Sequence, residues 1–350
     1  KLLVKNMSQK VLITGGSGFI GSNLVNFLIK KKYKIINLDI LNYASILDKY
    51  KNFTKNKNYI FYKKNINQSE FIEKIFSKNK IDGIFNLASN SHVDRSIDSP
   101  VNFIKQNIFS NLKFIDQINF LIKKKKFSGK FINISTDEVY GSINDKASTE
   151  DFPLLPNSPY SASKASIEHI LRSYNMTFKM PFINVRCCNN YGPYQFPEKF
   201  IPTAIISLLN KKSIPIYGNG KNVREWIHVY DYCYALEKIM KKGKIGQNYN
   251  VGSNFRLTNI DLSKMIYKKI KKLFPELKLN KKFFKKIVDR PGHDTRYAIN
   301  SQKIRKKLNW KPSINFSKGI EETIKWYILN INWLKYCSKK YKGQRLGLNG

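Results

Sequence analysis

The chain of 350 residues is short of acidic side chains and lacks long apolar runs. Its 24 Asp and Glu residues stand against 63 Lys and Arg residues, which gives a formal net charge of +39. No run approaches the roughly 18 uncharged apolar residues that a membrane-spanning helix needs. The basic segment Lys1–Lys10 leads into a glycine turn instead of the apolar core of a signal peptide. These absences exclude an integral membrane protein and predict a cytoplasmic chain without membrane association.

Cysteine is also scarce, and the four residues are Cys187, Cys188, Cys233 and Cys337. They form no CxxC pair and no Cys/His cluster with zinc spacing, so no metal site is predicted. Neighbouring Cys187 and Cys188 are poorly placed for a mutual disulfide. We therefore expect buried free thiols in a reducing compartment.

Arginine is the third scarce residue type, because Lys supplies nearly all of the positive charge. Only nine of the 63 basic residues are Arg, the residue favoured for bidentate contacts with phosphates and bases. The lysines are scattered in groups such as 30–32, 123–126, 268–272 and 281–286. We interpret the charge as a compositional bias of solvated surfaces and expect no specific nucleic-acid partner; nonspecific adhesion to nucleic acid at low salt is expected.

Short apolar runs alternate with helical patterns over the first two-thirds of the chain, which predicts a parallel sheet with helices on both faces. The predicted strands are 10–14, 34–38, 58–62, 83–87, 130–135, 182–186 and 247–251. The predicted helices include 20–31, 68–78, 101–122, 161–175 and 230–242. From about Asn189 the pattern becomes irregular, returns to the sheet at about 227–251, and ends in a helix-rich portion.

The predicted fold class is therefore α/β: a Rossmann-like doubly wound parallel sheet with a smaller α+β substrate-binding lobe. We assign residues 7–188 and 222–252 to the Rossmann domain. Residues 189–221 and 253–340 are assigned to the smaller lobe.

A glycine-rich loop follows the first predicted strand and precedes a helix. Its glycines Gly15, Gly18 and Gly21 form a GxxGxxG variant of the dinucleotide fingerprint. Such glycines permit a tight turn, close approach to a pyrophosphate and close packing of helix on strand. Asp39 ends the second strand, where a carboxylate accepts hydrogen bonds from a ribose diol and repels a 2′-phosphate. The pattern predicts NAD as the cofactor, the alternative for Asp39 being an ordinary acid at a strand end.

Two carboxylates follow the strand at 130–135, in the sequence Thr136-Asp137-Glu138. The carboxyl ends of parallel strands border the ligand crevice, so this pair is predicted to lie near substrate. If the chain turns at Thr136, both Asp137 and Glu138 reach a ligand, one as acid and one as base. The alternative is that the pair caps a turn or a helix.

Tyr160 and Lys164 are four residues apart, which places them on one face of a helix. A nearby ammonium group stabilises tyrosinate and lowers the tyrosine pKa from its ordinary value of about 10. Tyr160 is thereby predicted to take a proton from a sugar hydroxyl while hydride leaves the same carbon. The alternative is a surface Tyr/Lys pair.

These motifs together resemble the extended short-chain dehydrogenase/reductase family. Within the nucleotide-sugar branch of that family, the chain resembles the dTDP-glucose 4,6-dehydratases. The resemblance rests on the TGxxGxxG loop, on YxxxK, and on SHVDRS at 91–96, STDEVYG at 135–141, NNYGPYQFPEK at 189–199 and DRPGHD at 289–294.

The resemblance implies an NAD-dependent hydro-lyase of deoxysugar biosynthesis, such as that of dTDP-rhamnose, which acts as a homodimer. Tyr160, supported by Lys164 and Thr136, would remove the C4 hydroxyl proton of dTDP-glucose as C4 hydride passes to NAD. Glu138 would then abstract the C5 proton while Asp137 protonates the departing C6 hydroxyl. Hydride return to C6 would give dTDP-4-keto-6-deoxyglucose and regenerate the cofactor.

The resemblance also implies that the Rossmann domain is NAD-binding and that the smaller lobe binds the nucleotide sugar, and it implies further site residues. Those expected at the cofactor, beside the three glycines, Asp39, Tyr160 and Lys164, are Phe19, Ile20, Ile40, Asn42, Asn65, Ile66, Leu87, Ala88, Ser91, Gln106 and Asn190. Those expected at the substrate are Ser91, Thr136, Asn189, Lys199, Phe200, Pro215, Tyr217, Arg224, Asn259, Arg290 and His293.

Three positions depart from the family pattern. Asn65 stands where the family has Asp near the adenine, Asn90 replaces an acid, and Gln106 replaces Thr. Two assigned substrate residues keep alternatives, since Arg224 could pair with Glu225 and His293 could serve a turn.

Three other functions remain open. A sister 4,6-dehydratase would act on a UDP-, GDP- or CDP-hexose, and the base is expected near Pro215–Tyr217. A UDP-sugar 4-epimerase would need no elimination acid and base. A non-catalytic nucleotide-binding or polyanion-binding protein would have no use for the residue set at 136–138, 160 and 164.

Overall fold

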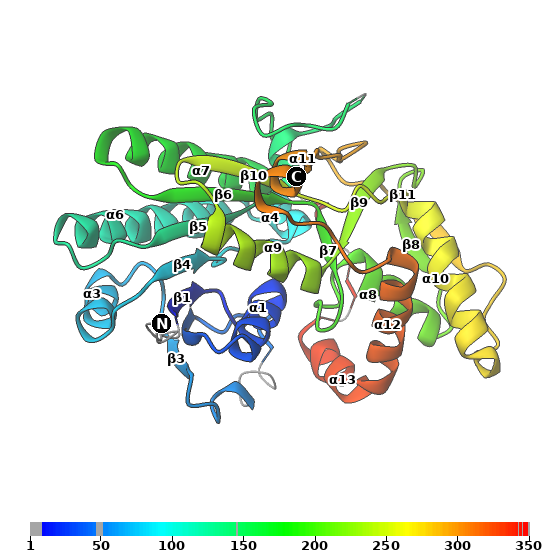
Figure 1. The fold of residues 1–350 in the computed structure, drawn as a ribbon. Coiled ribbons are helices and arrows are strands. Elements are labelled where there is room, and N and C mark those ends of the chain that lie inside the picture. Colours follow the sequence, from blue (N-terminus) through cyan, green and yellow to red (C-terminus); the bar gives the residue numbers. More distant parts are fainter. Residues whose placement is uncertain (1–8, 47–51, 145, 342, 345, 349–350) are drawn as a thin grey trace.

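The computed structural model describes residues 9–46, 52–144, 146–341, 343–344 and 346–348. Seven strands form one parallel sheet in the order β10-β6-β5-β4-β1-β2-β3 (Figure 1). They are β1 (Lys10–Thr14), β2 (Lys34–Asp39), β3 (Tyr59–Lys63), β4 (Gly83–Asn86), β5 (Lys130–Thr136), β6 (Phe182–Cys187) and β10 (Gln247–Val251). The strand order reverses between β1 and β4, as in doubly wound folds. The predicted fold class and all seven predicted strands are confirmed, with ends shifted by at most one residue.

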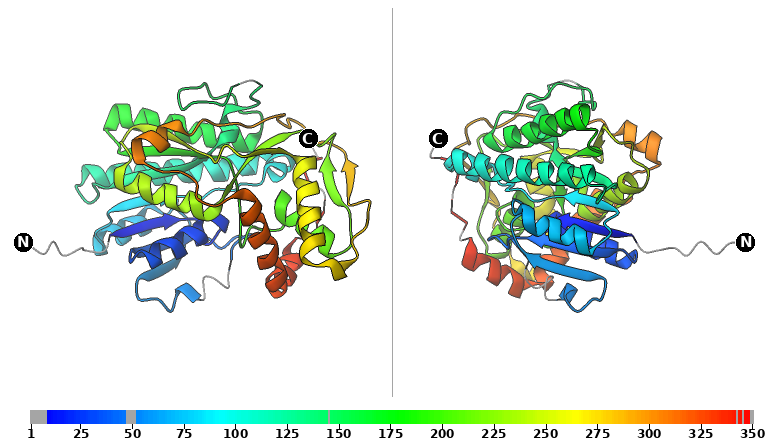
Figure 2. Two further views of the ribbon diagram at one scale, coloured as in Figure 1. Left: turned by 45° about the vertical axis from the view of Figure 1, so that its right-hand side comes forward. Right: turned by 90° about the vertical axis from the view of Figure 1, so that its left-hand side faces the viewer.

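Helices cover both faces of this sheet (Figure 2). One face carries α1 (Phe19–Lys30), α9 (Val229–Lys242) and α11 (Gln302–Leu308), and the other carries α3 (Ser69–Lys78), α6 (Ser110–Lys123) and α7 (Pro159–Phe178). Because strand side chains alternate between faces, Val11 and Ile13 enter the first core while Leu12 enters the second. Burial on both faces explains why these strands are continuous apolar runs.

The predicted helix 101–122 is interrupted. The structure divides this stretch into α5 (Pro100–Ile104), a π-helical turn (Lys105–Phe109) and α6. The turn contains buried Asn107, whose side chain accepts from Asn90 N at 2.8 Å and donates to Asn90 O at 3.0 Å. It also donates to Ser163 Oγ at 3.0 Å, so the turn ties the segment after β4 to α7. π turns of this kind are frequent near functional sites.

A smaller lobe is assembled from segments after β6. Its three-stranded sheet has the order β11-β9-β7, and its two-stranded sheet pairs β12 with β8. The elements are β7 (Asn189–Tyr191), α8 (Phe200–Leu209), β8 (Ile214–Tyr217), β9 (Val223–His228), β11 (Arg256–Thr258), α10 (Asn259–Leu273), a 3₁₀ turn (Pro275–Leu277), β12 (Phe284–Ile287), α12 (Phe316–Leu329) and α13 (Ile331–Lys340). They enclose a third hydrophobic core.

The return of the chain to the large sheet is later than predicted. β9 pairs with β7 and β11, so Ile227 and His228 belong to the lobe sheet, and the large sheet resumes only at β10. The division into residue ranges for two domains stays a prediction. Within the described ranges no helix combines the length and apolar character that crossing a bilayer requires.

A buried ion pair joins α7 to β6. The Arg186 guanidinium donates from NH2 to Glu168 Oε2 at 2.7 Å and from NH1 to Glu150 O at 2.9 Å, and both charged side chains are at most 4% exposed. Arg186→Met would leave the Glu168 carboxylate buried without its partner. We expect a loss of about 3–5 kcal/mol in the free energy of unfolding, measured by urea denaturation.

The matched control is Lys264→Met, which breaks the exposed Lys264–Asp261 pair, 52% exposed on each side. Exposed pairs contribute about 0–1 kcal/mol, so its unfolding curve should nearly coincide with that of the native protein. An equally small loss of unfolding free energy in both variants would show that the Arg186–Glu168 pair does not stabilise the fold.

Candidate active site

A cleft of about 1080 Å³ opens at the carboxyl ends of the strands, between the large sheet and the lobe. Its walls come from the segments at or after the ends of β1, β2, β4, β5 and β6, from the start of α7, and from β7, α8, β8 and β9. Every residue assigned to cofactor, substrate or catalysis from sequence lines this cleft except Asp137.

The glycine loop has the shape that a phosphate group requires. Gly15 has φ +70°, and a Cβ on Gly21 would lie 2.2 Å from Gly15 O, so neither position tolerates a side chain. A Cβ on Gly18 would meet nothing closer than 3.5 Å, because this residue faces the cleft. Gly18 is the N-cap of α1, and no side chain caps that helix. The N–H groups of the first turn are therefore available to an anion.

Asp39 sits beside this loop at the end of β2. Its Oδ2 accepts from Ser17 N at 2.9 Å and its Oδ1 accepts from Leu41 N at 2.8 Å. Burial raises the pKa of Asp39, and these two hydrogen bonds oppose the rise. Each oxygen keeps a lone pair, which suits the diol of a ribose.

Several buried polar atoms at the cleft have no hydrogen-bond partner within the described part of the chain. They are Ser135 Oγ, Asn190 Oδ1, Gln195 Oε1, Trp226 Nε1 and the Nε of Arg290. Buried polar atoms in proteins normally have partners, so these atoms indicate a polar ligand. The cleft thus fits both a dinucleotide at the glycine loop and an anionic group at the lobe.

The chain turns sharply at Thr136. Thr136 Oγ1 accepts from Glu138 N at 3.3 Å and begins a 3₁₀ turn (Asp137–Tyr140). Glu138 faces the cleft, whereas Asp137 is 2% exposed and lies behind the wall. Thr136 Oγ1 lies 3.3 Å from Asp137 Oδ1, and Asp137 Oδ2 has no partner in the described residues. Of these two carboxyl groups, therefore, Glu138 lines the cleft in this structure and Asp137 does not.

The two carboxyl groups have different electrostatic surroundings. Burial raises the pKa of Asp137 well above its usual range, and the charges of Glu138 and Glu225 add to this. Burial also raises the pKa of Glu138, but Arg290, Lys199 and Arg224 oppose the rise. Asp137 is therefore the carboxyl group with the stronger tendency to keep a proton, and Glu138 is the one better stabilised as a carboxylate.

Tyr160 and Lys164 project from the first turns of α7. Ser158 caps this helix in a capping box with Ser161, and Tyr160 is 8% exposed. Burial raises the pKa of Tyr160 well above its usual range, with Glu138 and Cys187 adding to the rise and a hydrogen bond with Thr136 opposing it. Burial lowers the pKa of Lys164 to about 8. Desolvation thus dominates the pKa of Tyr160 in the protein alone, and its lowering by Lys164 stays a prediction.

Three cations from the lobe face Glu138 across the cleft. Lys199 Nζ donates to Ser91 O at 2.6 Å, Arg224 NH2 donates to Asp294 O at 2.8 Å, and Arg290 NH1 donates to Asp94 Oδ1 at 3.1 Å. Arg224 does not pair with Glu225, which instead bonds Arg256 at 2.7 Å. Neighbouring residues of a strand point to opposite faces, which separates Arg224 from Glu225.

His293 both lines the cleft and stabilises its turn. Its Nδ1 lies 2.6 Å from Asp289 Oδ1, and burial lowers its pKa to about 4.

Two of the three positions that depart from the family pattern contact each other, since Asn90 Nδ2 donates to Gln106 Oε1. Asn65 lines the cleft while its Oδ1 accepts from Asn67 N at 3.1 Å.

Sequence reasoning missed several residues of the wall. His92, Asp94 and Glu198 lie within the quoted motifs but were not assigned roles, while Tyr43 and Tyr297 carry no sequence signal. Tyr297 donates to Asp294 Oδ2 at 2.6 Å and lies 3.4 Å from Glu138 Oε2. The Arg224 guanidinium lies 4.1 Å from the centre of the Tyr297 ring.

Comparison with known proteins agrees with this geometry. The family model described as GDP-mannose 4,6 dehydratase matches residues 12–323. The chain is 37% identical to dTDP-glucose 4,6-dehydratase of Xanthomonas campestris pv. campestris (strain B100), covering 96% of this chain and 98% of that protein. It is 39% identical to dTDP-glucose 4,6-dehydratase 1 of Escherichia coli (strain K12), covering 93% and 94%.

Among solved structures, dTDP-glucose 4,6-dehydratase of Bacillus anthracis in complex with NAD superimposes with a TM-score of 0.85 at 38% identity. The match covers 94% of this chain and 100% of that chain. The chain belongs to the dTDP-glucose 4,6-dehydratase family.

Proposed function

We propose that the protein is an NAD-dependent dTDP-glucose 4,6-dehydratase, which removes water from dTDP-glucose to give dTDP-4-keto-6-deoxyglucose. One observation carries the proposal. Thr136 contacts Tyr160, Asp137 and Glu138. The carboxyl groups of Asp137 and Glu138 have different electrostatic surroundings. Elimination of water from a ketone needs an acid and a base of this kind. Epimerisation at C4 involves no loss of water, so it needs neither this acid nor this base.

The residues at the glycine loop suit NAD. Gly15, Gly18 and Gly21 would hold the pyrophosphate at the N-terminus of α1, and Asp39 would hold the adenosine ribose. The further cofactor contacts proposed are Phe19, Ile20, Ile40, Asn42, Asn65, Ile66, Leu87, Ala88, Ser91, Gln106, Tyr160, Lys164 and Asn190. When bound, NAD supplies the hydride acceptor for oxidation and the hydride donor for the final reduction.

The lobe suits a nucleoside diphosphate sugar. Lys199, Arg224 and Arg290 would bind the diphosphate, and the unpartnered Nε of Arg290 is a donor available for it. Asn189, Phe200, Asn259 and His293 would complete the substrate site, with Pro215 and Tyr217 near the base. The sugar would then lie towards Ser91, Thr136 and Tyr160.

The proton transfers follow from the site. Tyr160 would accept the C4 hydroxyl proton, with Thr136 and Lys164 orienting its hydroxyl. Glu138 would accept the C5 proton, which the C4 ketone makes acidic. Asp137, whose pKa burial raises well above its usual range, would deliver a proton to the C6 hydroxyl as that group leaves as water. Its buried position means that a small movement of the 3₁₀ turn must bring it to the sugar.

The direct test is incubation of the purified protein with dTDP-glucose without added NAD, followed by mass spectrometry of the nucleotide sugar. Loss of one water supports both the activity and a cofactor that is retained through purification. UDP-glucose and GDP-mannose are incubated in parallel. Loss of water from one of these alone would show that the protein is a dehydratase specific for that nucleotide sugar. No change in any nucleotide sugar, even with NAD added, would reject the proposal.

We further propose a cytoplasmic homodimer. The four cysteines are buried free thiols, which suits a reducing compartment. Exposed apolar side chains on α5, α6 and α7, among them Val101, Phe120 and Met176, support association through these helices. Light scattering on the purified protein would measure the oligomeric state.

A further inference from the structure

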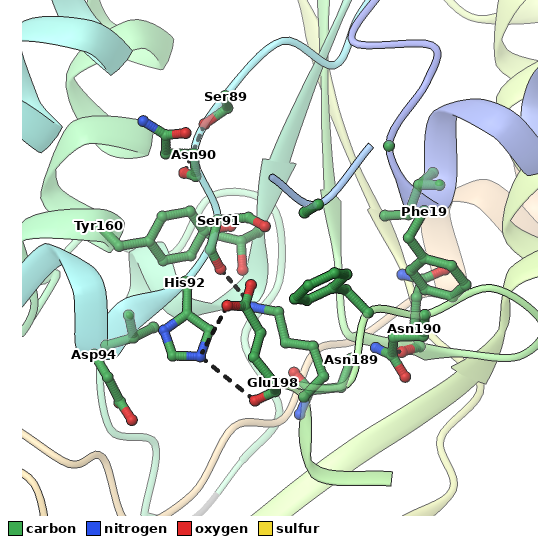
Figure 3. A pocket seen from close by; sticks show the side chains of 18 of the residues that line it. Phe19, Ser89, Asn90, Ser91, His92, Asp94, Tyr160, Asn189, Asn190 and Glu198 are labelled. Carbon is green, nitrogen blue, oxygen red and sulfur yellow. Dashed lines mark hydrogen bonds and ion pairs between the residues drawn. The ribbon is translucent and has the colours of Figure 1, made fainter. Parts of the chain in front are cut away.

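Two neighbouring dipeptides, Ser91-His92 and Glu198-Lys199, hold each other across the cleft wall. Lys199 Nζ donates to Ser91 O at 2.6 Å, and His92 Nε2 lies 3.4 Å from Glu198 O. Each dipeptide thus contacts the main chain of the other through a side chain, and Figure 3 shows the His92 ring beside Glu198. Because Ser91 follows β4 and Lys199 precedes α8, this reciprocal contact joins the large sheet to the lobe.

His92 is neutral in this arrangement. Burial lowers its pKa to about 4, and its Nδ1 accepts from Arg95 N at 3.3 Å as the N-cap of α4 (Val93–Asp98). An accepting Nδ1 carries no hydrogen, so the ring proton is on Nε2 and points towards Glu198 O. The histidine therefore acts as a fixed donor between the two segments.

The Glu198 carboxylate is the centre of this cluster. Its side chain is 3% exposed, its Oε1 accepts from Tyr43 OH at 2.9 Å, and its Oε2 accepts from Arg95 Nε at 3.2 Å. The Arg95 guanidinium also stacks 4.1 Å from the centre of the Tyr43 ring. A buried carboxylate is stable only with such partners. Tyr43 lies in the loop after β2 that also carries Asn42, so Glu198 connects the cofactor side of the cleft with the substrate side.

We propose that Glu198 is a positioning residue, which fixes Lys199 against Ser91 and holds both in register with the loop after β2. The inference rests on the proposed function, because Lys199 and Ser91 are proposed substrate ligands. Glu198 itself would touch neither substrate nor cofactor. It would act through the position and the charge of Lys199.

The charges around Lys199 give this role a measurable signature. Burial lowers the pKa of Lys199, while Glu198, Glu138 and Asp94 raise it and Arg290 lowers it further. His92 also interacts with Lys199, and burial lowers the pKa of His92 to about 4. Removing the charge of Glu198 would lower the Lys199 pKa, so Lys199 would lose its proton, and its hold on a diphosphate, at a lower pH than in the native protein.

The test is Glu198→Gln in the NAD-loaded protein, with dTDP binding measured by titration calorimetry from neutral to alkaline pH. A hydrogen bond to a charged group contributes about 1.5–3 kcal/mol, so we expect the Kd to rise by about tenfold or more at neutral pH. We expect the ratio of the variant Kd to the native Kd to grow as the pH rises. In turnover of dTDP-glucose, the KM should rise while kcat changes by less than about threefold.

The matched control is Glu237→Gln on α9, a buried glutamate that accepts from Lys241 Nζ at 2.6 Å and does not line the cleft. It should bind dTDP as the native protein does. Tyr43→Phe removes one hydrogen bond from Glu198 and provides a milder variant. We expect its Kd for dTDP to rise as well, but by less than in Glu198→Gln. Thermal denaturation checks that each variant is folded.

Equal dTDP affinity in the native protein and in both Glu198→Gln and Tyr43→Phe would overturn the inference alone. A loss of dTDP affinity by the same factor at every pH would show a general structural defect, and it would also overturn the positioning role of Glu198. Failure of the native protein to bind dTDP would overturn the proposed function, and the positioning role of Glu198 with it.

Discussion

Tyr160→Phe is expected to lower kcat for water loss from dTDP-glucose by about 10³-fold, within the range of about 10²–10⁴-fold for loss of a general base. The substitution removes one oxygen atom, the proposed acceptor of the C4 hydroxyl proton. The ring stays buried against Phe103, with centroids 6.2 Å apart, so folding and substrate binding should persist. The block falls before any oxidation, and unchanged dTDP-glucose is the only nucleotide sugar that should be recovered.

The control for this variant is Tyr174→Phe on the same helix. The Tyr174 hydroxyl donates to Asp116 Oδ1 at 3.2 Å in an exposed position away from the cleft. Its kcat should equal that of the native protein. If Tyr160→Phe kept more than about a tenth of the native kcat, Tyr160 could not be the base that starts the reaction.

The large sheet could be predicted because its strands are buried on both faces. Each of them is a short apolar run that contrasts with the helices on either side. The lobe strands β7, β9 and β11 carry no such pattern, since Asn189–Tyr191 and Val223–His228 include amides, charges and a histidine. They become strands by pairing with each other across long sequence separations, as Asn189 does with Trp226. Local sequence contains no information on such pairing.

The motif residues of the site could be predicted, but their environments could not. The spacing of Tyr160 and Lys164 indicates a common helix face and says nothing of burial, which in fact dominates the pKa of both. Likewise the pair Asp137-Glu138 predicts an acid and a base, whereas the assignment depends on Arg290 and Lys199, which approach Glu138 from the lobe. These contacts exist only after the two parts of the chain have packed together.

Glu138→Gln is expected to separate oxidation from elimination. The amide has nearly the shape of the carboxylate, and the Tyr297 hydroxyl, 3.4 Å from Glu138 Oε2, can still donate to its oxygen. It cannot accept the C5 proton at a useful rate, so water loss should fall by about 10³-fold. The C4 oxidation that depends on Tyr160 should continue. After rapid acid quenching, mass spectrometry should therefore find a 4-ketone that has lost two hydrogens and no water.

Solvent exchange gives the second readout of this variant. In deuterated water the native protein should place deuterium at C5 of recovered sugar, because Glu138 removes that proton and returns one from solvent. The Glu138→Gln variant should form the ketone without this exchange, Tyr160→Phe should form neither product, and Glu237→Gln should match the native protein. Full turnover or undiminished C5 exchange in Glu138→Gln would show that another group is the base. Since Asp137 is buried behind the cleft wall and Tyr160 is needed at C4, Glu138 is the one carboxylate of the predicted catalytic set that faces the cleft and could do this work.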